Sequence, residues 1–240
     1  FPYTTLFRSE KAQHIAHHLA TEIYGKRNEF KFSGIDLKPK EAIEQALLLK
    51  TPVILSDAGD NPTGGGAGIN TCLLKMFLEH GQTNGRTVLF STIYDPVACE
   101  MLMRFEEGSR VDFMLGVGLD AYSSPVRIQG VLQSKGKTIK GVMNNRNSTD
   151  CGNSALVTFG DYAVQVTDIR DSLMYKVQLE KAKIDLSDYD VIVVKQAYQF
   201  EDIANYGESH VLAYTPGATY QDIKGIPFTK IPKTIFPFKD

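Results

Sequence analysis

Cysteine is scarce in this sequence of 240 residues, and its three cysteines, Cys72, Cys99 and Cys151, lie far apart. They form no Cys-x-x-Cys pair, which argues against a zinc knuckle and against a disulfide framework. No apolar run approaches the roughly 20 residues that span a bilayer. The charges nearly cancel, with a formal net charge of −2, so neither nucleic acid nor an anionic membrane is an expected partner. A reducing, cytoplasmic location fits these absences best.

Histidine is also sparse, with five in the chain. His14, His17 and His18 lie beside the apolar face of the first predicted helix, and a His-x-x-x-His pair can hold a metal across one helical turn. No Glu-x-x-His or His-Glu-x-x-His pattern accompanies this pair, so a solvated or partly packed histidine cluster is the competing interpretation. The five histidines form no convincing three-ligand set with an open fourth position. We therefore expect this chain to hold no metal.

The remaining composition is that of an ordinary globular protein, with 42% hydrophobic and 22% charged residues. This length allows one large domain or two small ones. No internal repeat and no flexible linker interrupts residues 10–240, which favours one domain there. Residues 1–9, FPYTTLFRS, show neither helical nor strand periodicity. We interpret them as a non-native leader.

One glycine-rich stretch, residues 57–68, stands between two well-marked elements. The apolar run at 51–56 is typical of a buried strand, and residues 70–80 have apolar side chains at helical spacing and stop at Gly81. The order is therefore strand, glycine loop, helix. Such a loop directs backbone N–H groups toward an anion above the helix N-terminus.

Three consecutive glycines, Gly64, Gly65 and Gly66, remove the side chains that would keep a ligand from that backbone. Asp57 and Asp60 add carboxylates at the end of the strand, where α/β sheets commonly place function. Neither the P-loop nor the Gly-x-Gly-x-x-Gly fingerprint matches this spacing. A ligand site and a tight, crowded turn therefore both remain open.

The rest of the chain predicts an α/β fold with a mixed, largely parallel sheet flanked by helices. Strands are expected at 52–56, 87–93, 111–117 and 190–195, with helices between them, which indicates βαβ units. Short alternating runs punctuated by glycine and asparagine predict an antiparallel, β-rich excursion around 125–168. Further elements are expected at the positions that follow: helices at 10–30, 38–50, 97–107, within 171–183 and at 196–206, a loop at 144–150, a strand at 211–214, and an extended strap at 226–240.

The full loop, Asp-Ala-Gly-Asp-Asn-Pro-Thr-Gly-Gly-Gly-Ala-Gly, resembles the signature of the C-terminal domain of the MlrC, or microcystinase C-like, metallopeptidase family. Further landmarks of that family have counterparts in this chain: Asp95-Pro96, Gly116 to Gly118 with Pro125-Val126, Arg170, Val193-Val-Lys195, Thr215-Pro-Gly217 and the final Ile-Phe-Pro-Phe-Lys-Asp. The resemblance covers nearly everything after the first nine residues. The sequence departs from the family pattern at Leu119 and Ser124, at Ile69 and Asn70, where many relatives have an aspartate, and at Gln199, where some have a histidine.

This resemblance implies hydrolysis of a small peptide or amide by a zinc-dependent enzyme whose metal ligands lie in a separate N-terminal domain. That domain is the expected partner, and this chain would be incomplete as a catalyst on its own. The glycine loop would then face the interdomain cleft and hold a substrate carboxylate or carbonyl. The residues expected at the substrate are Asp57, Asp60, Asn61, Gly64, Gly65, Gly66, Arg170 and Lys195.

Alternatives remain at each level. Lys195 could be a strand-end lysine that reaches solvent, and Arg170 could form a structural ion pair. The whole chain could be a non-catalytic module that binds an anion or carboxylate, or a structural domain that shapes a homo-oligomer. Convergence of the glycine loop, Arg170 and Lys195 on one site would favour an enzyme or a binding module, whereas scattered positions would favour a structural role.

Overall fold

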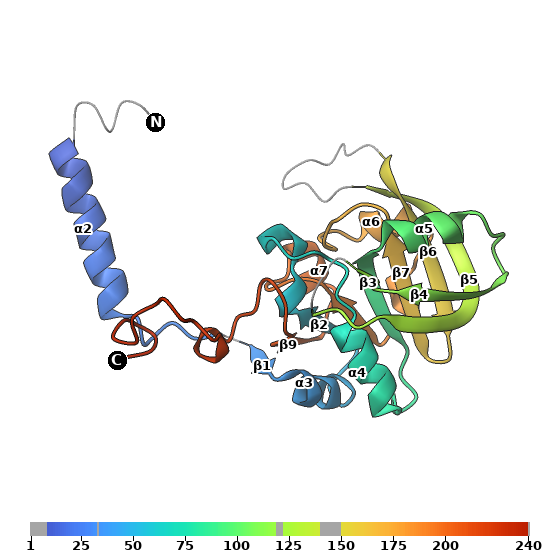
Figure 1. Ribbon diagram of the computed structural model, residues 1–240, viewed down its shortest axis with the longest axis horizontal. Helices are drawn as coiled ribbons and strands as arrows, with labels where there is room; N and C mark the ends of the chain where they lie inside the picture. The colour runs from blue at the N-terminus through green and yellow to red at the C-terminus, as the bar shows by residue number, and fades with distance from the viewer. Residues whose placement is uncertain (1–8, 33, 119–121, 140–149, 240) are drawn as a thin grey trace. The chain divides into compact units, whose positions relative to one another are not determined.

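The computed structural model describes residues 9–32, 34–118, 122–139 and 150–239. The chain divides into two compact units, residues 1–33 and 34–240, and each is described by itself. The first contains helix α2 (Ser9–Gly25), which includes Ser9 of the predicted leader. The second contains all of the strands and the other helices (Figure 1).

A nine-stranded sheet forms the second unit, in the order β1-β9-β2-β8-β3-β7-β6-β5-β4. Neighbours from β1 to β7 are parallel, and the pairs from β7 to β4 are antiparallel. In sheet order, the strands are β1 (Ile35–Leu37), β9 (Ser209–Ala213), β2 (Val53–Asp57), β8 (Val191–Val194), β3 (Val88–Tyr94), β7 (Tyr162–Thr167), β6 (Asp150–Phe159), β5 (Val126–Ile139) and β4 (Arg110–Leu115). The predicted α/β fold with an antiparallel excursion is confirmed.

Apolar side chains fill both faces of this sheet. One cluster packs the sheet against α3 (Pro39–Ala46), α4 (Cys72–His80) and α5 (Pro96–Met103), with Phe77 of α4 in edge-to-face contact with Phe90 of β3 at 5.4 Å. The other cluster lies under α6 (Val177–Glu180), α7 (Glu201–Ala204) and the segments beside them. Every residue of β2 and β8 is buried, which explains why β8 is apolar throughout and β2 begins with three apolar residues.

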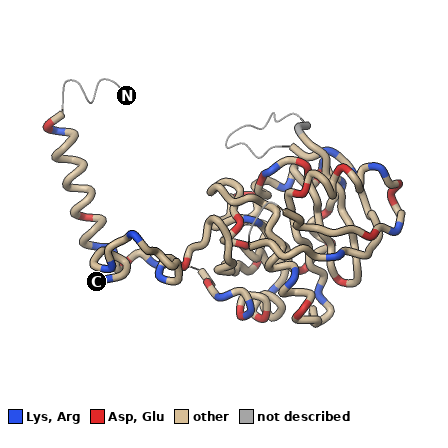
Figure 2. Tube along the Cα trace, in the orientation of Figure 1, with Lys and Arg blue, Asp and Glu red and all other residues tan. Residues whose placement is uncertain are grey.

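Local signals in the sequence explain where the elements begin and end. Helix α4 stops at Gly81, which has a φ of 72°, a left-handed conformation that suits glycine. Helix α5 starts at Pro96, and the Asp95 carboxylate accepts a hydrogen bond from the Ala98 N–H at 3.0 Å. Acidic and basic residues are interspersed along the chain (Figure 2). No helix in the described ranges is both long and apolar enough to cross a membrane.

The structure differs from the sequence-based expectation in the place of β4 and in the lengths of two later helices. The four predicted strands share the sheet, but β4 lies at its edge and pairs antiparallel with β5, so α5 joins no pair of parallel neighbours. The helices expected within 171–183 and at 196–206 shrink to the single turns α6 and α7. There, buried glutamine side chains bind backbone groups that a longer helix would use itself: Gln178 Oε1 accepts from the N–H groups of Met174 and Tyr175 at 2.7 and 2.9 Å. The loop expected at 144–150 lies outside the described residues, apart from Asp150, which begins β6.

Candidate functional site

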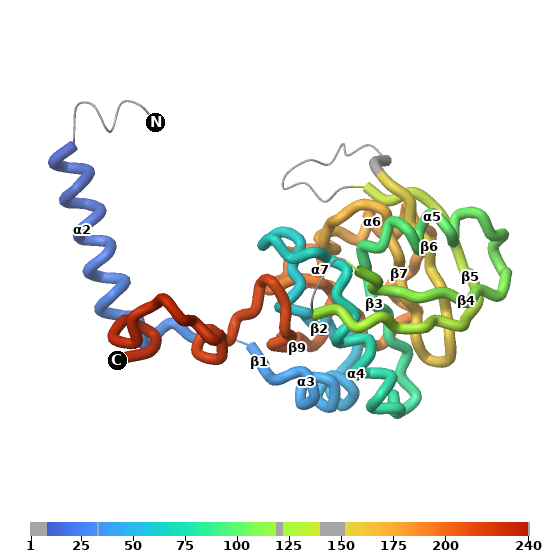
Figure 3. Tube along the Cα trace, in the orientation of Figure 1, coloured from blue at the N-terminus to red at the C-terminus, as the bar shows by residue number. Residues whose placement is uncertain are grey.

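Parallel strands end at one edge of the sheet, and the candidate site is built there. The glycine loop follows β2, Lys195 follows β8, Arg170 lies three residues after β7, and Thr215 lies two residues after β9. Because these strands run in the same direction, their carboxyl ends meet, which is where open α/β sheets bind ligands. Figure 3 traces the loop in cyan from β2 to α4. The sheet therefore brings together segments that lie up to about 160 residues apart in the sequence.

A buried cluster of three charges lies at the centre of this edge. The Lys195 ammonium donates to Asp57 Oδ2 at 3.1 Å, to Asp60 Oδ2 at 2.9 Å and to the backbone oxygen of Asn70 at 2.6 Å. Lys195 and Asp57 are each 3% exposed and Asp60 is fully buried. An ammonium has three N–H donors. All three donors of Lys195 are therefore used inside the protein, and its side chain does not reach solvent.

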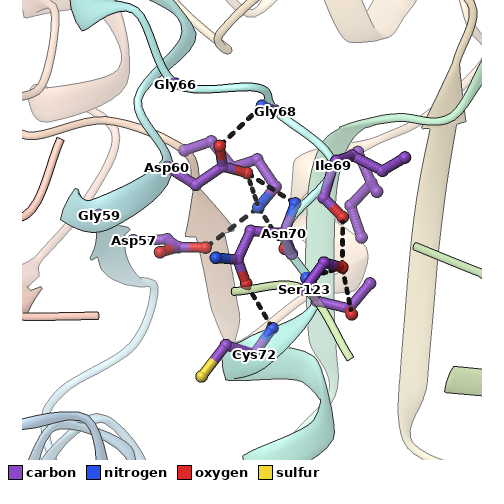
Figure 4. A network of polar contacts seen from close by, with 12 residues as sticks. Asp57, Gly59, Asp60, Gly66, Gly68, Ile69, Asn70, Cys72 and Ser123 are labelled. Carbon is purple, nitrogen blue, oxygen red and sulfur yellow. Dashed lines mark hydrogen bonds and ion pairs between the residues drawn. The ribbon is translucent and has the colours of Figure 1, made fainter. Parts of the chain in front are cut away.

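Asp60 holds the two ends of the loop in place. One oxygen of its carboxylate accepts from the Gly68 N–H at 2.7 Å, and the other accepts from the Asn70 N–H at 2.8 Å (Figure 4). Asn70 in turn accepts from the Cys72 N–H through its side chain at 2.8 Å, at the first turn of α4. A single carboxylate thus fixes both the glycine turn and the start of the helix.

The three charges shift one another's pKa values in different directions. Burial raises the pKa of Asp57 by more than Lys195 lowers it, and the nearby charge of Asp60 raises it further. Burial alone would raise the pKa of Asp60, but Lys195 and the N–H groups of Gly68 and Asn70 outweigh it and lower the pKa. Burial alone would lower the pKa of Lys195, but its two carboxylate neighbours raise it. Asp60 and Lys195 are therefore held as an ion pair, whereas Asp57 binds a proton more readily than an ordinary aspartate.

The consecutive glycines shape the loop through its own hydrogen bonds. The N–H groups of Gly64 and Gly66 donate to the backbone oxygen of Asn61 at 3.0 and 2.8 Å, and the Gly65 N–H donates to that of Pro62 at 3.3 Å. Gly65 has a φ of 103°, which suits glycine. At Gly66 an added Cβ would lie 2.7 Å from the backbone nitrogen of Asn61. An anion would have to compete with these carbonyl oxygens for the amides, so the crowded turn is present whether or not a ligand binds.

The Thr215-Pro-Gly217 turn closes the loop from the side of β9. The Thr215 hydroxyl donates to the Asp57 carboxylate and accepts from the Gly59 N–H at 2.9 Å. Gly59 and Gly217 bring the two backbones into direct contact: a Cβ added to Gly59 would overlap the carbonyl oxygen of Thr215, and one added to Gly217 would overlap that of Gly59. Neither position has room for a side chain.

Arg170 differs from Lys195 because it is exposed. Its guanidinium donates to the backbone oxygen of Gly66 at 3.0 Å, and its side chain passes close to Gly68, whose added Cβ would lie 3.5 Å from Arg170 Cγ. A guanidinium has five N–H donors, so most of them remain for another group. The segment after Arg170 is anchored, because the Ser172 hydroxyl donates to the backbone oxygen of Lys195 at 2.8 Å.

Two hollows of the second unit bear on where the site lies. A small cavity of about 10 Å³ adjoins the charge cluster and is lined by Asp57, Asn70, Ser91 and Lys195 together with apolar side chains. A space of that size holds at most about one water molecule. An open groove of about 520 Å³ lies over β4, β5 and β6, where polar residues such as Arg110 and Asp112 line it together with apolar ones such as Val131 and Phe159. The larger hollow is therefore not at the glycine loop, and we place the candidate site by its chemistry and not by its volume.

Comparison with known proteins gives this chemistry a family. The sequence profile of the family described as "MlrC C-terminus" matches residues 55–230, well over half of the chain. The chain belongs to the MlrC C-terminus family. The matched region contains the glycine loop, Arg170, Lys195 and the Thr215 turn.

Two relatives show how much of a longer protein this MlrC C-terminal domain corresponds to. Microcystinase C from Sphingomonas sp. is 26% identical over 153 residues, which is 62% of this chain and 29% of that protein. The crystal structure named "Putative metallopeptidase from Mesorhizobium sp. BNC1" has a TM-score of 0.73 at 20% identity, and the match covers 93% of this chain and 44% of that one. The second comparison shows a shared fold. The chain spans less than half the length of either relative.

The domain brings the predicted site residues together, but it gives them different surroundings. Arg170, Gly64 and Gly65 are exposed, whereas Asp57, Asp60, Asn61, Gly66 and Lys195 are buried. The convergence that separates a site from scattered positions is therefore present. Substrate contact stays a prediction for all eight residues.

Several contributors escaped sequence reasoning. In the sequence, Asn70 stands out only as a departure from the family pattern. In the structure, its backbone and side chain bind Lys195, Asp60, Cys72 and Pro216. Its place just before the first turn of α4 was the available signal, because asparagine side chains there bind free N–H groups. Gln199, a second departure, donates to the Ser56 hydroxyl at 3.0 Å.

The described residues also bear on metal and thiol chemistry. Among them, no three His, Cys, Asp or Glu side chains come close enough together to hold a metal ion. The zinc that the family resemblance implies thus does not fit the residues described in this chain, and we assign it no step here. The thiols of Cys72 and Cys99 are free, and burial raises both pKa values, that of Cys99 to about 12. Both cysteines are therefore poor nucleophiles at neutral pH.

The charge cluster predicts opposite pH dependences for two isosteric variants. Because the folded-state pKa of Asp60 lies below its ordinary value of 3.8, the stability that this carboxylate contributes is present above that pH and is lost as pH falls through the lowered pKa. The stability gap between wild type and Asp60→Asn should therefore narrow in acid. Asp57 has a raised pKa, so wild type should gain stability relative to Asp57→Asn as pH falls through it. Urea unfolding from pH 7 to pH 3 measures both gaps, and parallel curves for the two variants would contradict the assignment.

Proposed function

We propose that this chain is the C-terminal domain of a two-domain, zinc-dependent amide hydrolase, and that its glycine-loop edge faces the cleft between the domains. The family match supports the hydrolase class, and the share of each relative that the chain covers supports a second, upstream domain. The upstream domain would hold the metal. The substrate would be a small peptide or amide, and the enzyme would act in the cytoplasm.

The exposed guanidinium of Arg170, bound to the glycine loop, is the observation that carries this proposal. Of the two predicted cations, Lys195 has all its donors occupied inside the protein, whereas Arg170 presents a guanidinium over the loop while bound to Gly66. Guanidinium groups bind carboxylates through two parallel hydrogen bonds, which fixes orientation as well as position. Arg170 would therefore orient a substrate carboxylate or carbonyl above the exposed glycines, Gly64 and Gly65. The buried charge cluster of Asp57, Asp60 and Lys195 would contribute indirectly, because it holds the loop whose Gly66 binds Arg170.

Replacing Arg170 tests this assignment in the zinc-loaded, full-length protein. A charge-assisted hydrogen bond contributes about 1.5–3 kcal/mol. Arg170→Ala should therefore lower kcat/KM by roughly 10- to 100-fold for a linear peptide that the wild-type protein cleaves. Arg170→Lys keeps the positive charge but loses the planar guanidinium. Its kcat/KM should therefore lie between those of the wild type and Arg170→Ala. Peptide cleavage is followed by liquid chromatography with mass spectrometry across a panel of linear peptides.

Arg127→Ala is the matched control. Arg127 is an exposed arginine on β5 whose guanidinium binds Asp112 at 2.9 and 2.6 Å, and its loss should leave cleavage unchanged. An Arg170→Ala enzyme with unaltered kcat/KM would exclude Arg170 from the substrate site. A full-length protein that binds carboxylate peptides but cleaves none would favour a binding module over an enzyme.

A further inference from the structure

Strand β4 leaves one edge of the sheet open. It is the last strand in the sheet order, and its only sheet neighbour among the described residues is β5 (Figure 1). It has six residues, whereas β1 at the other edge has three. An open edge presents N–H and C=O groups that can pair with a strand of another chain. Strand β4 is therefore a candidate interaction surface.

The hydrogen bonds to β5 show which backbone groups of β4 point outward. The Leu132 N–H donates to the backbone oxygen of Ser109 at 2.9 Å, and the pairing register continues through Val111. Because every second residue of an antiparallel strand is hydrogen-bonded to the neighbouring strand, Ser109 and Val111 turn their backbone groups toward β5. Arg110 and Asp112 therefore turn theirs toward the open edge.

The side chains of the same two residues carry opposite charges on one face of β4. Both are exposed, and both line the open groove described above. The Asp112 carboxylate accepts two hydrogen bonds from Arg127 and one from Gln129, and a carboxylate has about four lone-pair sites, so it can accept another. The Arg110 guanidinium has no partner in the part of the chain that the structure describes. A cation with donors to spare thus lies two positions from an anion with an acceptor to spare.

We propose that a second copy of this chain pairs with β4 in antiparallel direction, with Val111 on the two-fold axis. In that register Arg110 lies opposite Asp112 of the partner subunit, and the outward backbone groups of these two residues exchange both of their hydrogen bonds. The two-fold axis repeats the same contact on its other side. Opposite charges directly across a strand pair stabilise it. This contact is independent of the function proposed above.

Charge selects both the partner and the register. An axis at Asp112 would set two aspartates against each other, and an axis at Phe113 would place Asp112 opposite Met114 and leave Arg110 without a carboxylate. Charges on edge strands usually prevent pairing, and a row of one sign would repel its own copy. Here the two signs follow each other on one face, so the edge is complementary to itself. That property favours a second copy over an unrelated strand.

Charge reversal tests the pairing by sedimentation velocity over a concentration series of this chain. So short a contact makes a weak dimer, so the wild type should shift from one chain to two as its concentration rises. Arg110→Asp sets aspartates against each other and Asp112→Arg sets arginines against each other, so each should weaken self-association by at least about tenfold. An equimolar mixture of the two variants should recover the two-chain species, because each copy then supplies the charge that the other lacks.

Lys50→Asp is the matched control. Lys50 is an exposed lysine just before β2, paired with Glu208 at 2.9 Å, and its reversal should leave the association unchanged. Hydrogen–deuterium exchange places the contact on the molecule: the amides of Arg110 and Asp112 should exchange more slowly at high concentration than at low concentration. That protection should be absent from each reversed variant alone and present in their mixture.

Three results would overturn the β4 pairing. They are a wild type that stays a single chain at every concentration, a self-association that the reversals leave unchanged, and a mixture that does not associate although the wild type does. Urea unfolding of each variant separates a folding defect from a lost contact. Asp112→Arg also breaks the pair with Arg127, whereas Arg110→Asp removes no bond within the described chain, so its effect on association is decisive even where Asp112→Arg is unstable.

Discussion

Replacing Lys195 by methionine is expected to lower the free energy of unfolding by about 3–5 kcal/mol, the range for removing one partner of a buried ion pair. The lysine ammonium is buried between the carboxylates of Asp57 and Asp60, at 3.1 and 2.9 Å. Its loss leaves these two neighbouring carboxylates without a cation. The backbone oxygen of Asn70 loses its donor as well. Uptake of a proton by Asp57, whose pKa is already raised, would relieve only part of this cost. Urea unfolding monitored by circular dichroism gives the value.

Two controls define the source of this loss. Removing all three charges, with Asp57→Asn and Asp60→Asn added to Lys195→Met, should recover part of the stability, because no unpaired charge remains buried. Lys183→Ala breaks an exposed pair with Glu107 at 2.8 Å, which solvent screens, and should therefore lower the free energy of unfolding far less than Lys195→Met. A Lys195→Met variant that loses no more than the Lys183→Ala variant would show that the buried cluster does not hold the loop.

Gly59→Ala should destabilise the domain by an amount at or above the upper end of the ~1–3 kcal/mol typical of overpacking. The added Cβ would overlap the carbonyl oxygen of Thr215 and would lie 2.9 Å from the carbonyl carbon of Pro216. Both are backbone atoms, so no flexible side chain can move away. The turn would have to shift, and with it the Thr215 hydroxyl that binds Asp57. Thermal and urea unfolding should both report the loss.

Gly65→Ala is the matched control within the same loop. Its added Cβ would meet nothing within 4 Å, so only the left-handed φ of 103° opposes the substitution. That conformation costs an alanine about 1–2 kcal/mol. Gly65→Ala should therefore lose less stability than Gly59→Ala. The reverse order would show that the Gly59 contact with the Thr215 turn is not tightly packed.

Local patterns explain what could be predicted from the sequence. The run from Val53 to Leu55 is apolar because β2 has strands on both sides and packing on both faces. Asp95-Pro96 marked the start of α5, and Gly81 marked the end of α4. The two helix signals act between neighbours in the chain, so the sequence alone contains those interactions, whereas the apolar run predicts a buried strand without naming its partners.

The charge cluster depends on distant contacts, which is why its arrangement could not be predicted. Lys195 meets Asp60 across 135 positions of sequence, and nothing around either residue specifies the pairing. A strand-end lysine has room to reach solvent, but this one is buried and its ammonium binds Asp60 and the backbone oxygen of Asn70 in the glycine loop. The helix within 171–183 is only the single turn α6 for a related reason: the helical spacing near Gln178 is present, but that side chain binds the backbone of Met174 and Tyr175.

The Asp60 carboxylate occupies the position that a bound phosphate occupies in many glycine loops: it is an anion that receives backbone N–H groups before a helix. Here that anion is part of the protein. The loop therefore carries its own permanent counter-ion, and its conformation should be the same with and without ligand. The entropic cost of ordering the loop is met during folding, so a substrate bound beside Arg170, as proposed above, would meet a rigid surface and lose little affinity to loop ordering. The inner side of the loop is correspondingly closed to phosphate, and selectivity must come from the outer side.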